Sequence, residues 1–349
     1  MYLQALANRV PPASFSQKEL WEIYRNSRLL DQLTPRSIWI VEKVLTGDNG
    51  IEKRHFALSD LEKLPSLDAE SQNRAFEKEA PKLASQALRE ALDKAQLKAN
   101  ELDALIVCTC TGYLCPGVSS HVAEQTGLRS DAFLLDLVGL GCGALVPSLR
   151  NAAGLIAGNP SARVAVVAVE ICSAALYLDD DPGVLISACL FGDGASASIW
   201  NGAPNAGPGL RAFDFDTLHQ PENREILRFE NRKGKLRNRL HHSVPIRAAK
   251  AVKFLLERSR ARCERPIQQV ITHTGGRDVL QAIENEIPEL DLSPSKSALR
   301  NFGNMSSPSI FFALEAFLDN QRISKDQDLW LCSFGAGFAA HSFRLARRE

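Results

Sequence analysis

One cysteine of the sequence, Cys142, stands between two glycines in the stretch GLGCGAL, directly before residues that read as a helix. A thiol in the first turn of a helix lies at the positive end of the helix dipole. Beside an imidazole, the pKa of such a thiol can fall from about 8.5 to roughly 3.5–7.5. Cys142 is therefore a candidate nucleophile, although a cysteine near a helix start is, taken alone, more often a small buried hydrophobe.

Two further polar residues follow strand-like runs in the second half of the chain. His273 stands in QVITHTGG, and Asn304 stands in NFGNMSS before another helix-like stretch. An imidazole can pair with a thiolate or donate to an oxyanion, and an amide offers an N–H donor that does not titrate. Together with Cys142 they suit an acyl-thioester site. Alone, His273 could be a turn residue and Asn304 a helix N-cap.

An internal repeat relates the elements that would have to position these three residues. IVCTCTG resembles QVITHTGG, which sets Cys110 opposite His273, and GLGCGAL resembles NFGNMSS, which sets Cys142 opposite Asn304. The two offsets, 163 and 162 residues, are nearly equal, which indicates a duplication. We expect one half at 1–205 with the nucleophile and one at 206–349 with the histidine and asparagine, packed so that their turns meet.

Strand-like and helix-like stretches alternate along the chain. ALIVCTCTG, RVAVVAVEIC, ASASIW, QQVITHTGG and DLWLCSFGAG read as buried strands. The first ninety residues read as helical, with one helix following Pro81, and GAPNAGPGL at 202–210 reads as a linker between the halves. The alternation predicts an α/β protein with parallel strand pairing.

Composition narrows the classes of function. The 349 residues hold 41 basic and 41 acidic side chains, so no basic field favours nucleic acid or an anionic membrane. We find no apolar run long enough to span a bilayer and no secretory signal, and expect a cytoplasmic protein. The eight cysteines read as reduced thiols, and the run C-x-C-x4-C at 108–115 lacks the partners of a structural zinc site, so no metal is expected.

Several stretches together resemble one known family, the chalcone and stilbene synthases, or type III polyketide synthases. They are GLGCGAL, VVAVEICSAA, CLFGDGASASIW, ITHTGGRDVLQAIE, NFGNMSSPSIFFALE and SFGAGF. The resemblance covers residue 100 to the C-terminus and, more weakly, GIEKRHFAL. It implies a thiolase fold with duplicated five-layer αβαβα architecture, a homodimer, and iterative decarboxylative condensation of malonyl-CoA onto an acyl starter, with no cofactor. The stretch EICS is closer to the microbial alkylpyrone and alkylresorcinol synthases, whose starters are fatty acyl chains.

The resemblance also implies roles for particular residues. Cys142 would carry the acyl group, and His273 and Asn304 would stabilise the enolate and the condensing carbonyl. Phe191 matches a gatekeeper between access tunnel and cavity; its alternative is a core aromatic. A glycine-rich loop, Gly335, Ala336 and Gly337, would shape the cavity, and Cys115 would reach into the cavity of the partner subunit. Thr111, Cys172 and Ala175 would line the cavity.

Two departures from the plant enzymes affect substrate delivery. A second gatekeeper phenylalanine is replaced by Asn238, which predicts a wider or more polar tunnel mouth. The basic residues that hold coenzyme A phosphates fall on non-cationic positions. These non-cationic positions are Val41, Val44 and Asp48. Two alternatives therefore stay open: delivery of the starter by an acyl carrier protein, or binding of coenzyme A by other cations. The candidate cations are Lys53, Arg54, Arg232, Lys233 and Lys235.

Two alternatives to an iterative synthase that makes a pyrone or a resorcinol remain. A single-round ketoacyl synthase or an ester-forming acyltransferase would use the same fold and the same thioester. A catalytically silent thiolase-fold protein would only bind an acyl chain. The presence of Cys142, His273 and Asn304 together favours an enzyme.

Overall fold

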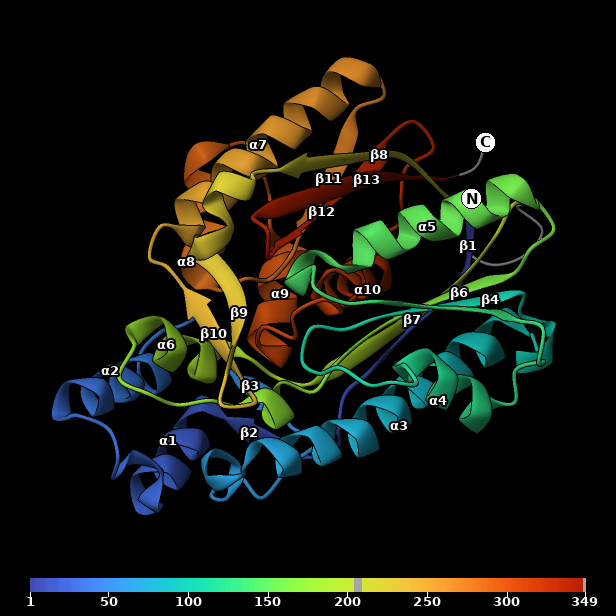
Figure 1. The fold of residues 1–349 in the computed structure, drawn as a ribbon. Coiled ribbons are helices and arrows are strands. Elements are labelled where there is room, and N and C mark those ends of the chain that lie inside the picture. The colour runs from blue at the N-terminus through green and yellow to red at the C-terminus, as the bar shows by residue number, and fades with distance from the viewer. Residues whose placement is uncertain (204–208, 348–349) are drawn as a thin grey trace.

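The computed structural model describes residues 1–203 and 209–347. Nine strands form one mixed sheet (Figure 1). The strands from the second half of the chain lie toward one edge of this sheet, and the strands from the first half lie toward the other edge. From one edge to the other they are β11 (Ile267–Thr272), β12 (Asp328–Gly335), β13 (Ala339–Arg347), β8 (Leu210–His219), β1 (Tyr2–Arg9), β7 (Gly194–Asn201), β6 (Val164–Glu170), β4 (Ala104–Cys108) and β5 (Phe133–Leu137).

Only a short ladder connects the two sets of strands. β1 and β8 pair at two positions, Tyr2 with Arg211 and Leu3 with Leu210. The remaining strands form two separate antiparallel pairs, β2 (Ser14–Ser16) with β3 (Lys53–His55), and the hairpin of β9 (Leu227–Arg232) with β10 (Lys235–Leu240). The nine-stranded sheet therefore divides into two smaller sheets, one from each half of the chain, which are joined only by this ladder in the described residues.

Helices lie outside both sheets and between them (Figure 1). α3 packs on β1, β7 and β6, α7 packs on β8, β12 and β13, and α5 and α10 contact strands of both halves. This gives five layers, α, β, α, β, α. The helices are α1 (Gln17–Asn26), α2 (Pro35–Thr46), α3 (Ala69–Ala95), α4 (Val118–Thr126), α5 (Leu145–Gly158), α6 (Pro182–Leu190), α7 (Val244–Arg262), α8 (Arg277–Glu286), α9 (Ser293–Phe302) and α10 (Ser309–Asn320).

The middle layer forms the largest shared core. Leu145 and Leu149 of α5 and Phe311 and Leu314 of α10 are buried in one cluster with residues from strands of both halves. Apolar residues around most of a helix circumference suit a helix covered on all sides. Because α5 begins beside Cys142 and α10 follows Asn304, this packing carries the two loops toward each other.

Three expectations about the fold were wrong. The sheet is mixed, since among the described residues its strands pair in parallel only between β4 and β5, β4 and β6, and β11 and β12. The first residues form the central strand β1 instead of a helix, and α3 begins at Ala69 and passes through Pro81. Residues 204–208, which contain the proposed boundary and most of the proposed linker, lie outside the described residues.

Candidate active site

Cys142 lies in a single helical turn, Gly141–Gly143, that leads into α5. Gly141 has a positive φ of 57°, and a Cβ added to Gly335 would lie only 2.5 Å from the amide nitrogen of Gly143. The turn after β12 therefore packs directly behind the cysteine. Gly335 and Ala336 contact this backbone, whereas Gly337 lies against Ala339 and His219. None of the three lines either of the two cavities described below, and their role in shaping the cavity stays a prediction.

An outer cavity of about 630 Å³ brings the three candidate catalytic residues together. Its walls include Cys142 from the first half and His273 and Asn304 from the second. His273 follows strand β11, as expected. Asn304 lies between helices α9 and α10, so the expectation that it follows a strand is wrong, although its loop does lead into a helix. Asn304 and His273 are nearly inaccessible, at 4% and 2% exposure, whereas Cys142 is partly exposed.

Backbone pairing joins the loop of Asn304 to that of Phe191. The amide of Asn304 donates to the carbonyl of Leu190 at 2.9 Å, and the amide of Gly192 donates to the carbonyl of Asn304 at 3.0 Å. The side-chain oxygen of Asn304 accepts from the amide of Ser306 at 2.8 Å. This last bond fixes the orientation of the carboxamide and leaves its NH₂ group as the donor.

Burial dominates the acid–base properties of the site. Burial raises the pKa of Cys142 to about 12, and Glu170 contributes in the same direction. The Ser306 hydroxyl, which donates to the sulfur at 3.2 Å, lowers the pKa of Cys142. Burial also lowers the pKa of His273 to about 3. Desolvation of the sulfur therefore opposes the lowering of the Cys142 pKa that the helix dipole and a neighbouring imidazole were expected to produce.

Glu170, at the end of β6, is an ionisable residue beside the site that sequence reasoning missed. Its carboxylate is fully buried and accepts hydrogen bonds from the hydroxyls of Thr109, Thr111 and Ser307 and from the amide of Cys110. Burial raises its pKa. A lone carboxylate that ends the apolar run VAVVAVE was the available signal, because a buried charge needs such partners.

A second, inner cavity of about 40 Å³ lies beyond Phe191. Thr111, Cys172 and Ala175 line it, as the resemblance implied, together with Cys110 and Ser306. Phe191 and Asn238 line both cavities, and this is the arrangement expected of gate residues. Asn238 donates to the hydroxyl of Ser187 at 2.8 Å, which holds its side chain against α6.

Cys115 is not part of either cavity of its own chain. It is exposed and lies with Tyr113 and His121 in a separate surface recess. Its implied contact with a partner subunit stays a prediction.

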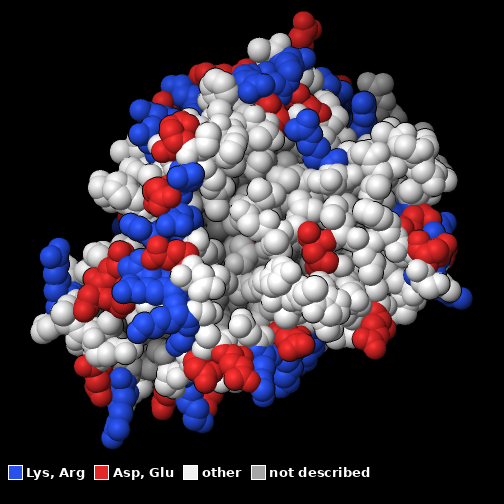
Figure 2. Space-filling view, in the orientation of Figure 1, with Lys and Arg blue, Asp and Glu red and all other residues white. Residues whose placement is uncertain are grey.

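The cations that were considered for coenzyme A phosphates do not line the outer cavity. Arg54 is fully buried, Arg232 pairs with Asp179 at 3.4 Å, and neither Lys53, Lys233 nor Lys235 reaches the cavity wall. The wall instead carries three other cations and, beside them, four carboxylates: Lys43, Arg239 and Arg277, with Asp48, Asp181, Glu225 and Asp278. Figure 2 likewise shows basic and acidic side chains intermingled along the border of this face.

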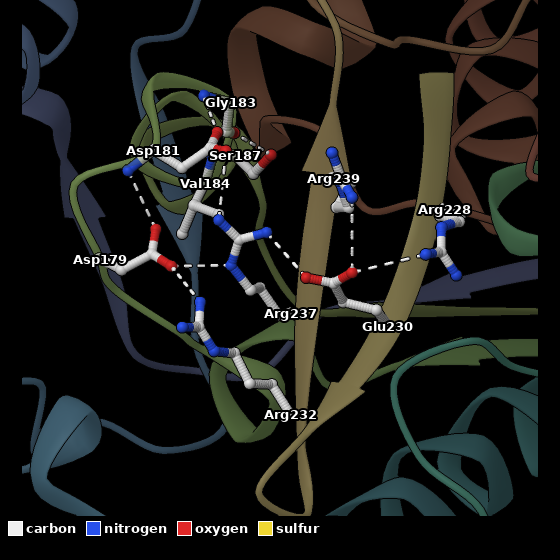
Figure 3. A network of polar contacts seen from close by, with 10 residues as sticks. All are labelled: Asp179, Asp181, Gly183, Val184, Ser187, Arg228, Glu230, Arg232, Arg237 and Arg239. Carbon is white, nitrogen blue, oxygen red and sulfur yellow. Dashed lines mark hydrogen bonds and ion pairs between the residues drawn. The ribbon is translucent and has the colours of Figure 1, made fainter. Parts of the chain in front are cut away.

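A charged network holds the β9–β10 hairpin against the loop before α6 (Figure 3). Arg237 donates to Asp179 at 2.7 Å, to Asp181 at 3.1 Å and to Glu230 at 2.9 Å. These carboxylates raise the pKa of Arg237, whose side chain is only 9% exposed. The acidic loop at 179–181 therefore fixes β10, and hence Asn238, at the mouth of the inner cavity.

Within residues 1–203 and 209–347, no group of His, Cys, Asp or Glu side chains could hold a metal ion. None of the helices in that part of the chain is both long and apolar enough to cross a bilayer.

A five-layer duplicated fold with cysteine, histidine and asparagine around one cavity defines a thiolase-fold condensing enzyme. Residues 12–206 match the family model FAE1/Type III polyketide synthase-like protein. Residues 263–346 match the model 3-Oxoacyl-[acyl-carrier-protein (ACP)] synthase III C terminal. The chain therefore belongs to the FAE1/type III polyketide synthase-like family and is an acyltransferase of that type.

Characterised relatives span nearly the whole chain. A 1,3,6,8-tetrahydroxynaphthalene synthase of Streptomyces peucetius is 28% identical, with 96% of this chain and 90% of the relative aligned. A phloroglucinol synthase of Pseudomonas fluorescens is 26% identical, with 85% and 86% aligned. The crystal structure of 1,3,6,8-tetrahydroxynaphthalene synthase from Streptomyces coelicolor has the same fold, with a TM-score of 0.87, 24% identity and full coverage of both chains.

Proposed function

We propose that the protein condenses malonyl-CoA iteratively and decarboxylatively onto an acyl starter held as a thioester on Cys142, and releases a pyrone or a resorcinol. The observation that carries this proposal is the meeting of Cys142, His273 and Asn304, from both halves of the chain, in one cavity. The substrates are acyl thioesters and the reaction needs no cofactor or metal. The fatty acyl starter and the kinship with alkylpyrone and alkylresorcinol synthases remain predictions.

The geometry supports the following division of roles. The sulfur of Cys142 attacks the starter thioester, and the thiol proton passes to the departing coenzyme A sulfur. A malonyl thioester then loses carbon dioxide, and the NH₂ group of Asn304 and a ring N–H of neutral His273 donate to the resulting enolate oxygen. The enolate carbon attacks the acyl carbon, the C–S bond to Cys142 breaks, and the thiolate leaves. Each oxyanion donor typically contributes about 10²–10³ in rate.

The two cavities bear on the starter and on the product length. A cavity needs roughly 10–15 Å³ for each water-sized group, so the inner cavity of about 40 Å³ holds only a few heavy atoms. A fatty chain would have to occupy the outer cavity of about 630 Å³. The small inner cavity also favours the second candidate, a single-round ketoacyl synthase or ester-forming acyltransferase.

Product mass spectrometry tests the proposal. Malonyl-CoA is supplied with a panel of acyl-CoA starters from acetyl to stearoyl and with aromatic starters, and in parallel with starters on an acyl carrier protein. Triketide or tetraketide pyrones or resorcinols, absent with Cys142→Ala, would support it. A product with one extension only, or an ester, would favour the second candidate, and no product from any thioester would favour a silent acyl-binding protein.

We also propose a homodimer that forms through the edge strand β5. Exposed apolar side chains gather on β5 and next to it, namely those of Phe133, Leu134 and Val138, which are 50%, 37% and 47% exposed. An apolar edge strand is a template for pairing with another chain. Figure 2 shows a largely uncharged area on the side where α4 and α5 lie. Light scattering should give the mass of two chains, and Leu134→Lys should give one. A cytoplasmic location stays a prediction.

A further inference from the structure

Arg54 is buried at the back of the site. Its side chain is 0% exposed, although Arg54 belongs to the short two-stranded pair of β2 and β3, which is separate from the main sheet. Its guanidinium donates to the side-chain oxygen of Gln17 at 2.9 Å and to the carbonyls of Ala188 and Phe191 at 2.8 and 2.7 Å. Within the described part of the chain, no carboxylate forms an ion pair with it.

A buried charge without a counter-ion is costly unless other dipoles compensate it. The compensating groups here are carbonyls at the C-terminal end of α6, where the helix dipole is negative. Phe191 is the residue that caps this helix. The cation therefore binds the helix end from which the gate residue projects, and its hydrogen bond to the Phe191 carbonyl fixes the backbone there.

The stem of the same side chain contacts the loop of Asn304. A Cβ added to Gly303 would lie 2.8 Å from Cγ of Arg54, and one added to Gly192 would lie 3.4 Å from its Cβ. Gly303 has a φ of 71°, so this close approach depends on a glycine in a left-handed conformation. Arg54 thus fills the space between the residue after Phe191 and the residue before Asn304, at the place where the two loops pair.

We propose that Arg54 is a positioning residue, which sets the place of Phe191 and Asn304 relative to Cys142 and thereby both the decarboxylation rate and the selection of starters. This inference rests on the function proposed above. Arg54 touches no substrate atom, since it lines neither cavity. Its effect passes through the backbone of the two loops.

The test compares Arg54→Lys and Arg54→Met with the wild-type chain. Lysine keeps the charge but loses the planar fork that binds two carbonyls and Gln17 at once. Because a displacement of about 1 Å can cost about 10²-fold in rate, we expect kcat for malonyl-CoA decarboxylation, measured as carbon dioxide release, to fall roughly 10–100-fold. We expect the preference among starter lengths to change as well.

Arg344 offers a matched control, because it is another fully buried arginine. It pairs with Asp328 at 3.0 Å and bonds to Ser259, and none of its partners lines either cavity. Arg344→Lys should lower Tm while the folded protein keeps its kcat and its starter preference. If Arg54→Lys and Arg54→Met behave like Arg344→Lys in both respects, Arg54 is only a stabilising residue and the proposal is wrong.

A second readout does not depend on polyketide synthesis. Alkylation of Cys142 by iodoacetamide and by its N-octyl analogue, followed by peptide mass spectrometry, reports how the outer cavity, whose wall includes Phe191 and Asn304, accommodates short and long reagents. The ratio of the two rates should change several-fold in the Arg54 variants and stay constant in Arg344→Lys. An unchanged ratio in the Arg54 variants overturns the positioning role. If wild-type protein makes no product from any thioester, the proposed function fails, and this ratio still decides the role of Arg54.

Discussion

Replacement of Ser306 by alanine tests how the protein controls the ionisation of its nucleophile. The hydroxyl of Ser306 donates to the sulfur of Cys142 at 3.2 Å and lies 3.1 Å from the sulfur of Cys110. It is the group that lowers the pKa of Cys142 most, against the raising effects of burial and of Glu170. Ser306→Ala removes this donor and leaves the other contributions in place.

The magnitude follows from the strength of such a bond. A hydrogen bond to a charged group contributes about 1.5–3 kcal/mol, and one pKa unit corresponds to about 1.36 kcal/mol. The pKa of Cys142 should therefore rise by about 1–2 units, which leaves roughly 10–100 times less thiolate at any pH below it. A more basic thiolate is also more nucleophilic, with a Brønsted slope of about 0.4–0.5. The net rate of alkylation should therefore fall by about 3–10-fold.

The assay measures the rate at which iodoacetamide labels Cys142 between pH 7 and pH 9.5, read from the peptide that contains it. Ser307→Ala is the matched control, because Ser307 is adjacent, equally buried at 1% exposure, and donates to Glu170 instead of to Cys142. Its labelling rate should stay close to the wild-type rate. Equal rates in Ser306→Ala and wild type would refute the assignment of the hydroxyl as the donor, and equal slowing in both variants would indicate general loosening of the loop.

Three further predictions concern neighbouring groups. Asn304→Ala should lower the condensation rate by at least ~10²-fold through loss of an oxyanion donor; unchanged turnover would remove Asn304 from the mechanism. Glu170→Gln places an NH₂ group among donors and should destabilise the fold by about 1–3 kcal/mol in urea unfolding, whereas an unaltered midpoint would mean that Glu170 is already protonated. Because burial lowers the pKa of His273 to about 3, stability should fall as pH drops below the ordinary value, since the unfolded chain binds the proton first. His273→Gln should reduce that slope between pH 6 and pH 4, and an identical slope would contradict it.

The chemistry of the site could be predicted from local patterns. Cys142 and Asn304 occupy equivalent turns of a duplicated sequence, and His273 stands at the turn equivalent to that of Cys110. Equivalent turns of the two halves meet in a pseudo-symmetric fold, and the outer cavity does contain all three residues. The buried strands β4, β6, β7, β11 and β12 were likewise evident as apolar runs. Each of these features depends on residues that are near one another in the sequence.

Long-range packing determines the features of the fold that were predicted wrongly from the sequence. The segment YLQALANR forms the central strand β1 because β7 and β8 flank it, although its own pattern does not alternate. Pro81 stands inside α3 because that helix is held along its length against β1, β6 and β7. Antiparallel pairing likewise depends on partner strands that lie far away in the chain, which local periodicity cannot indicate.

Burial decided the electrostatics in the same way. Arg54 was considered for phosphate binding from its charge alone, but the structure encloses it behind Phe191 and Asn304. The thiol of Cys142 was expected to ionise readily, yet the protein around it raises its pKa. The sequence by itself determined which functional groups are available and in which turns they stand. Only the tertiary structure decided their solvation and their partners, because both depend on atoms that distant segments bring within a few ångströms.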